Sequence, residues 1–407
     1  MRIDHGDILS RIQLLRQDWL ITLSRNQTTD TTYLSAWHLN GSTDSHCAAK
    51  VEVAGHPSKF AAAVRNGGNS VIIALFNNYR ISGGVEIFSL SLTDDYIFED
   101  APVSPLKRVA EISYSDKPAP GYDSLDHRGM FVEVQVNNNL VAVSLARINR
   151  SGPPLTYQII LVDMCSLAAV VISKTIAEDV TCSRFIFKLL PSHIAILFSG
   201  QNEGSLYWQD IRDALKLCSS AGTLALNGTR HTTFFMDRLP IFDIGTLQPT
   251  YTSGFFGMLH DVFFTAEVIR TTQSTLGIIS RRLERLWAFR LTLSPASPGW
   301  APSLQVSLEL TSSLRLKTGL NIENLALGRT GYRMVLLERS WETDEYKLKK
   351  VTLPMPGRRT NVAVHDLIPS QVALPFELHQ CISIWFEEAT GRVCFGLHTG
   401  QMYLLDV

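Results

Sequence analysis

A strand pattern that recurs seven times constrains the fold of this chain more than any other feature of its sequence. Each copy has an apolar strand, a polar or glycine-containing turn, and a second strand that ends in alternating aromatic and aliphatic residues. The second strands begin roughly 61 residues apart on average, which is a long period for a repeat protein. They are Leu34–Leu39, Val85–Leu90, Tyr157–Val162, Leu206–Ile211, Arg285–Arg290, Tyr346–Val351 and Gln401–Asp406.

Burial of both faces of such sheets requires that they pack against one another. A single antiparallel sheet cannot cover both of its faces, whereas a ring of sheets does so and leaves only short edges. The sequence therefore predicts an all-β fold, a β-propeller of about seven blades, with six or eight blades left open and a two-domain β protein as the alternative. We expect the last strand, Gln401–Val407, to pair with an N-terminal strand and seal the ring. The hairpin at Met130–Leu145, where valines alternate with polar residues, is the clearest single copy.

The N-terminal residues predict one short amphipathic helix, with Asp7 placed to cap its start. The expected organisation is thus a helical segment at 1–22 followed by a propeller domain at 23–407. The apolar positions that recur at the three-to-four spacing of a helix face are Ile8, Ile12, Leu15 and Trp19.

Three other segments interrupt the strand pattern. Asp210–Cys218 is a second, shorter helix candidate between strands. Ser115–Arg128 and Leu293–Leu304 each contain two or more prolines, which cannot donate ladder hydrogen bonds. We expect both to be long exposed loops, of the kind that binds partners on the faces of a propeller.

Charge and cysteine content argue against several classes of partner. Lys and Arg number 37 and Asp and Glu 38, so the net charge of −1 favours neither nucleic acid nor a membrane surface as a partner. The lysines Lys347 and Lys349 alternate on a strand, which is typical of a solvated face. The six cysteines are scattered without metal-site spacing, so we expect buried free thiols and no metal. The N-terminus lacks the apolar core of a signal peptide, which favours the cytoplasm or nucleus.

The sequence contains none of the common catalytic or cofactor motifs. GxSxG, GxxxxGK[ST], GxGxxG and HExxH are all absent, and so is the S-x-D-x-G-x-x-W turn of hydrolytic propellers. We therefore expect no catalytic residue, no cofactor and no enzymatic activity.

Two C-terminal segments resemble a known family. GRTGYRMVLLERSWETDEYKLKK, Gly328–Lys350, and the last 34 residues, Leu374–Val407, resemble the C-terminal region of F-box-like proteins expanded in mushroom-forming fungi. Ile12–Trp19 is similar to the helix that follows the F-box there. The resemblance implies a substrate receptor of a cullin-RING ubiquitin ligase, in which an F-box docks the Skp-type adaptor and the C-terminal region holds the target.

This chain departs from that family pattern at the F-box itself. No F-box of roughly 40 residues precedes the predicted helix, so a Skp-type adaptor is expected as a partner only if an F-box lies upstream. Leu374–Leu378 mimics the opening of an F-box, but Cys381–Phe386 continues as a strand, which argues against an adaptor site there.

The turn of the sixth hairpin holds the candidate contact residues Glu338, Arg339, Trp341 and Glu342. Arg and Trp dominate interface hot spots, which favours a partner contact. Trp341 could equally be structural and cover a blade edge, and the sequence leaves both interpretations open. We predict a monomeric, non-enzymatic protein-interaction module, with a carbohydrate-acting or carbohydrate-binding propeller, a hydrolase or a lectin, as the alternative.

Overall fold

The fold is described from a computed structural model of the chain. The described residues are 2–4, 6–16, 18–40, 44–55, 57–65, 67–77, 84–92, 106–113, 130–147, 155–176, 184–199, 204–216, 232–235, 239–253, 261–266, 274–282, 285–295, 304–315, 320–328, 332–354, 362–369 and 372–407.

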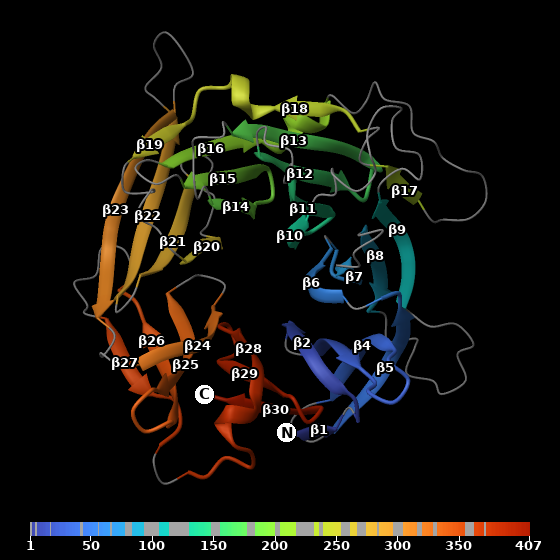
Figure 1. Ribbon diagram of the computed structural model, residues 1–407, viewed down its shortest axis with the longest axis vertical. Helices are drawn as coiled ribbons and strands as arrows, with labels where there is room; N and C mark the ends of the chain where they lie inside the picture. Colours follow the sequence, from blue (N-terminus) through green and yellow to red (C-terminus); the bar gives the residue numbers. More distant parts are fainter. Residues whose placement is uncertain are drawn as a thin grey trace.

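These residues form seven sheets that stand around a common centre (Figure 1). Four strands in antiparallel order make up each blade, counted from the innermost strand outward. The first two blades are β2 (Ile8–Leu15), β3 (Trp19–Arg25), β4 (Thr32–Asn40) and β5 (Asp44–Val53), then β6 (Pro57–Val64), β7 (Ser70–Asn77), β8 (Gly84–Ser91) and β9 (Leu106–Ser113).

The next three blades follow in chain order. The third holds β10 (Met130–Asn137), β11 (Leu140–Arg147), β12 (Leu155–Asp163) and β13 (Ala168–Ile176). The fourth holds β14 (Arg184–Leu189), β15 (His193–Ser199), β16 (Gly204–Asp210) and β19 (Tyr251–Ser253). The fifth holds β20 (Asp261–Ala266), β21 (Ser274–Arg282), β22 (Arg285–Pro295) and β23 (Leu304–Arg315).

The last two blades bring the chain back to its start. The sixth holds β24 (Leu320–Leu327), β25 (Arg333–Ser340), β26 (Tyr346–Thr352) and β27 (Ala363–Asp366). The seventh holds β28 (Cys381–Glu387), β29 (Arg392–Leu397), β30 (Gln401–Asp406) and, as its outermost strand, β1 (Arg2–Asp4). Two short strands add to outer edges in parallel: β17 (Thr232–Phe235) on β9 and β18 (Ile241–Asp243) on β13.

The seven repeated strands of the sequence are the third strands of the seven blades. They correspond to β4, β8, β12, β16, β22, β26 and β30. Each third strand lies between two others in its sheet, and in β4, β8 and β12 the side chains are largely buried on both faces; Leu34 and Ile160, for example, are fully buried. The all-β propeller prediction and the blade number of seven are confirmed, and the two-domain alternative is wrong.

The ring is sealed by hydrogen bonding between the two ends of the chain, as the sequence predicts. Strand β1 pairs antiparallel with β30, with Ile3 opposite Met402. The N and C labels accordingly lie close together in Figure 1. Ile3 and Met402 are both buried and join the apolar cluster between the seventh and first blades.

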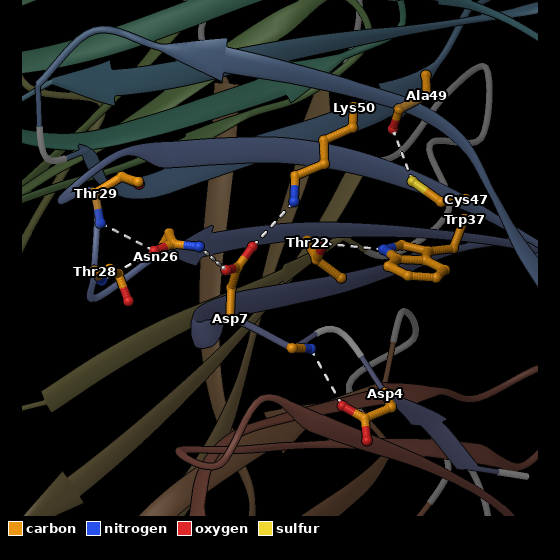
Figure 2. Close-up of polar contacts among 11 residues, drawn as sticks. Asp4, Asp7, Thr22, Asn26, Thr28, Thr29, Trp37, Cys47, Ala49 and Lys50 are labelled. Carbon is orange, nitrogen blue, oxygen red and sulfur yellow. Dashed lines mark hydrogen bonds and ion pairs between the residues drawn. The ribbon is translucent and has the colours of Figure 1, made fainter.

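A polar contact at the start of β2 supports the same junction (Figure 2). The buried carboxylate of Asp7 accepts a hydrogen bond from Asn26 Nδ2 at 2.9 Å and pairs with Lys50 Nζ at 3.0 Å. Asn26 Oδ1 in turn accepts from the backbone amides of Thr28 and Thr29, which fixes the turn between β3 and β4. Through these contacts, Asp7 anchors the β1–β2 connection to the β3–β4 turn and to strand β5 of the first blade.

The predicted N-terminal helix is wrong, because Ile8–Leu15 and Trp19–Arg25 form strands β2 and β3. A β-bulge between Leu9 and Arg11 inserts one extra residue. The buried positions Leu9 and Ile12 are therefore three residues apart on one face of the strand, a spacing that imitates a helix. The turn at Arg16, whose φ is 56°, separates Leu15 at the end of β2 from Trp19 at the start of β3, and this four-residue spacing also imitates a helix. The described residues between 2 and 25 accordingly belong to blades one and seven.

The other segment predictions had mixed outcomes. A helix, α1 (Ile211–Lys216), lies within the predicted Asp210–Cys218. Loop Ser115–Arg128 lies outside the described residues. Loop Leu293–Leu304 is shorter than predicted, because the β22–β23 ladder extends until Pro295 stands opposite Leu304.

Burial differs among the four cysteines that the structure describes. Cys381 and Cys394 are buried free thiols, as predicted, and burial raises the pKa of Cys381 to about 12. Cys47 and Cys165 are free but exposed, so the expectation of burial is wrong for them. Cys182 and Cys218 lie outside the described residues.

The close approach of Gly400 to the β1–β2 connection gives a test of ring closure. Gly400 has φ +84°, and a Cβ there would collide with the backbone oxygen of Asp7. Gly67 has a similar φ of +94°, but a Cβ added there would meet no atom within 4 Å. We expect Gly67→Ala to cost about 1 kcal/mol from backbone strain alone.

Gly400→Ala should cost at least about 1 kcal/mol more, because the backbone at the junction must also move apart. Urea denaturation of both variants measures the difference. Equal losses of unfolding free energy would show that the two termini are not held together as described.

Candidate functional site

The turn that carries the candidate contact residues lies at one end of the ring. We call this end the turn face. It is defined as the end where the innermost strands begin, and it carries the turns between second and third strands. Residues 26–31, 341–345 and 398–400 form three of these turns. Its connections include the β1–β2 segment at Asp7 and the chain between β27 and β28.

Trp341 is the most exposed large apolar residue among those described, at 65% of its surface. It opens the turn between β25 and β26. The Ser340 amide donates to Glu345 O, and the Asp344 amide donates to Ser340 O, both at 2.9 Å. Asp344 adopts a positive φ of 57°, which closes the turn tightly. The indole is therefore held on a short, hydrogen-bonded turn.

The Arg339 side chain connects Trp341 to the body of the blade. Its guanidinium carbon lies 5.4 Å from the Trp341 ring centre and 5.6 Å from that of Tyr346, within cation–π range. Its Nε donates to Asp344 Oδ1 at 2.7 Å, and this hydrogen bond raises the pKa of Arg339. The guanidinium is thus fixed between two aromatic rings and a carboxylate.

Glu323 extends this arrangement to the centre of the ring. It lies at a bulge in the innermost strand β24, and its Oε1 is 3.8 Å from Arg339 Nη1. The Asn321 amide donates to the same Glu323 oxygen at 3.1 Å. The turn carrying Trp341 is therefore linked by Arg339 to a strand that lines the central channel.

The four predicted contact residues separate into two groups. Arg339, Trp341 and Glu342 lie at the surface, with Arg339 only partly exposed. Glu338 is 8% exposed, so it belongs to the blade interior and its assignment as a surface contact is wrong. Side chains alternate along a strand, and the neighbour of an outward Arg339 is therefore turned inward.

Three participants were missed by the sequence reasoning: Asp344, Tyr346 and Glu323. Tyr346 stands directly opposite Arg339 in the β25–β26 ladder, so correct hairpin pairing would have found it. Glu323 could not be found in this way, because its approach depends on the bulge in β24.

Two further apolar side chains are exposed where the chain enters the seventh blade. Val372, in the connection from β27 to β28, is 54% exposed, and Ile382 at the start of β28 is 39% exposed. Both lie on the turn face, as Trp341 does. The turn face of the sixth and seventh blades therefore exposes apolar side chains among charged ones.

The strand lysines do not form an uncompensated basic surface. Lys347 lies 3.4 Å from Glu345, and Lys349 pairs with Asp366 on β27. These pairs agree with the solvated face that the alternating sequence indicates.

No group of three or more His, Cys, Asp or Glu side chains among the described residues is arranged to hold a metal ion. The described helices include none with the length and apolar character needed to cross a membrane.

Comparison with known proteins adds only weak likenesses. No protein-family model matches the chain, and no curated protein matches it. A chain of the mitotic checkpoint complex is 8% identical with a TM-score of 0.46, over 100% of this chain and 93% of that one. The WD40 domain of SCAP from fission yeast is 10% identical with a TM-score of 0.36, over 99% and 95%. An acylaminoacyl peptidase from Pyrococcus horikoshii is 8% identical with a TM-score of 0.44, over 96% of this chain and 49% of the peptidase. Likenesses at this level carry no functional argument, and the propeller assignment rests on the seven sheets.

The different burial of Glu338 and Glu342 gives a test of the site geometry. Glu338→Ala should lower the unfolding free energy by about 1 to 3 kcal/mol, because a buried side chain with its polar contacts is removed. Glu342→Ala should change it by less than about 0.5 kcal/mol, because the side chain is exposed. Thermal unfolding of the two variants measures both values. A neutral Glu338→Ala would contradict the inward orientation of this residue.

Proposed function

We propose that this chain is a protein-binding propeller that recognises its partner with the turn face of the sixth and seventh blades. The observation that carries the proposal is Trp341, exposed to 65% and yet held in place by Arg339. A fixed aromatic side chain loses little conformational entropy on binding, and Trp and Arg are the residues most enriched at interface hot spots.

Electrostatics at this surface favours a partner segment that combines an apolar group with polar ones. Arg339 is paired with Asp344 and approaches Glu323, so its charge is already compensated. The surface therefore presents the indole, flanked by Glu342 and Asp344, rather than a free cation. We infer that the partner places an apolar side chain against Trp341 and a hydrogen-bond donor or a basic group near these carboxylates.

The resemblance of Gly328–Lys350 and Leu374–Val407 to F-box-like proteins supports a more specific form of the proposal. In that form the partner is the target of a cullin-RING ubiquitin ligase, and the propeller is its substrate receptor. The segment at Leu374–Leu378 leads directly into 3-10 helix η5 (Leu378–Gln380) and strand β28, so it is no F-box helix. This form of the proposal requires an adaptor-binding F-box, which the described residues do not contain.

Substitution of the indole tests the binding surface. Trp341→Ala should weaken partner binding by about tenfold or more, since hot-spot tryptophans contribute roughly 2 kcal/mol or more. Its melting temperature should stay near that of the wild type, because an exposed side chain is removed. Affinity capture from a lysate of the source cells, quantified by mass spectrometry, identifies the proteins lost from the variant.

Ile241→Ala is the matched control, because Ile241 is 64% exposed but lies on β18 at the outer edge of the third blade. It should retain every partner that the wild type captures. Identical partner sets for all three proteins would contradict the proposal. Retention of the wild type on a polysaccharide resin, lost in Trp341→Ala, would instead favour carbohydrate binding. Capture of a ubiquitin ligase target that Trp341→Ala fails to hold would support the receptor form.

A further inference from the structure

The turn between β25 and β26 already holds one cation among aromatic rings and a carboxylate. The guanidinium carbon of Arg339 lies 5.4 Å from the Trp341 ring centre and 5.6 Å from that of Tyr346. Its Nε donates to Asp344 Oδ1 at 2.7 Å. Aromatic rings together with a carboxylate are therefore the groups with which this surface binds a cation of its own chain.

A second pair of such groups lies in the same turn without a cation. Trp341 is 65% exposed, although Arg339 lies beside its ring. The next residue, Glu342, is exposed as well, and it makes no hydrogen bond or ion pair within the described part of the chain. An open indole surface and an uncompensated carboxylate therefore occupy adjacent residues.

The charges around the turn leave it with a surplus of carboxylates. Arg339 is shared between Asp344 and, at 3.8 Å, Glu323. Lys347 lies 3.4 Å from Glu345. Together with the unpaired glutamate, four carboxylates face two cations, and none of these six side chains has a further ion pair among the described residues. The surplus attracts a cationic group and repels an acidic one.

The backbone presents the indole and the free carboxylate in an ordered arrangement. The Ser340 amide donates to Glu345 O at 2.9 Å, and the Asp344 amide donates to Ser340 O at 2.9 Å. The Thr343 amide donates to Ser340 Oγ at 3.3 Å. Trp341 and Glu342 lie between these anchor points, so little backbone entropy is lost when a ligand binds them.

We propose that Trp341 and Glu342 form a docking site for one basic side chain of the protein partner. The inference rests on the proposed function and specifies which kind of residue the turn face recognises. The apolar stem of the basic side chain packs on the exposed indole, and its charged head approaches the Glu342 carboxylate. One partner residue thereby supplies both the apolar contact and the basic group that this surface favours.

Arginine suits the site better than lysine. A planar guanidinium packs on an aromatic ring while its N–H groups at the edge donate to a carboxylate. Arg339 does both within this turn, since it lies in cation–π range of two rings and donates to Asp344. The site for the partner repeats these elements with Trp341 and Glu342.

Fluorine NMR of the full chain, labelled with fluorotryptophan, tests the site with a defined probe. The signal of Trp341 is identified by its loss in Trp341→Ala. At low ionic strength, N-acetylarginine amide should shift this signal in a saturable manner. N-acetylcitrulline amide has nearly the same shape but no charge, and it should bind at least about threefold more weakly, because the cation–π and charge-pair contributions are lost.

Removal of the free carboxylate separates its charge from the effect of the indole. Glu342→Gln should weaken binding of the arginine probe about threefold and leave binding of the citrulline probe unchanged. The matched control is Glu52→Gln, which removes an exposed glutamate from β5 in the first blade. It should bind the arginine probe as tightly as the wild type, because the overall charge changes equally but the site does not.

Three results would overturn the proposal: equal affinity for the two probes, an unchanged arginine affinity in Glu342→Gln, or no saturable shift of the Trp341 signal. Affinity capture separates this failure from failure of the proposed function. A partner that is lost from Trp341→Ala but fully retained by Glu342→Gln would leave protein binding intact and would refute recognition of a basic side chain. Loss of the same partner from both variants would support it.

Discussion

The pairing of β1 with β30 is the interaction on which the rest of the structure depends. Seven sheets that each bury both faces must form a closed ring, because an open array would leave one face of the first and last blades in water. The last blade takes three strands from the C-terminus and its fourth from residues 2–4. Apolar packing of Ile3 and Met402 and the buried Asp7 contacts stabilise this junction.

Closure also determines where function can reside. Once the ring is sealed, third strands such as β12 are buried on both faces, and their residues serve the core. The turns, the connections between blades and the channel remain accessible. Trp341 occupies one such turn, and Arg339 lies beside it at the end of β25. The ion pair of Arg339 with Glu323 joins this turn to the channel, since Glu323 belongs to an innermost strand.

The sequence predicted the strands with the most uniform environment and failed where the backbone is irregular. Third strands such as β8 and β12 are recognisable because burial on both sides selects nearly continuous apolar and aromatic runs. Innermost strands carry polar residues and bulges, and the extra residue near Leu9 made β2 resemble a helix. Exposed Trp341 was found from residue type alone. Glu323 was not found, because its approach to Arg339 depends on the bulge in β24, which no local pattern encodes.

A disulfide across the junction tests closure most directly. Asp4 stands opposite Gln401 in the β1–β30 ladder, and Asp4 is exposed. In a background with the exposed Cys47 and Cys165 replaced by serine, Asp4→Cys with Gln401→Cys should form a bond within one chain, detected by peptide mass mapping. Oxidation should then raise the unfolding free energy by about 4 kcal/mol, because the bond closes a very long loop. A bond found only between chains, or none at all, would contradict the closed ring.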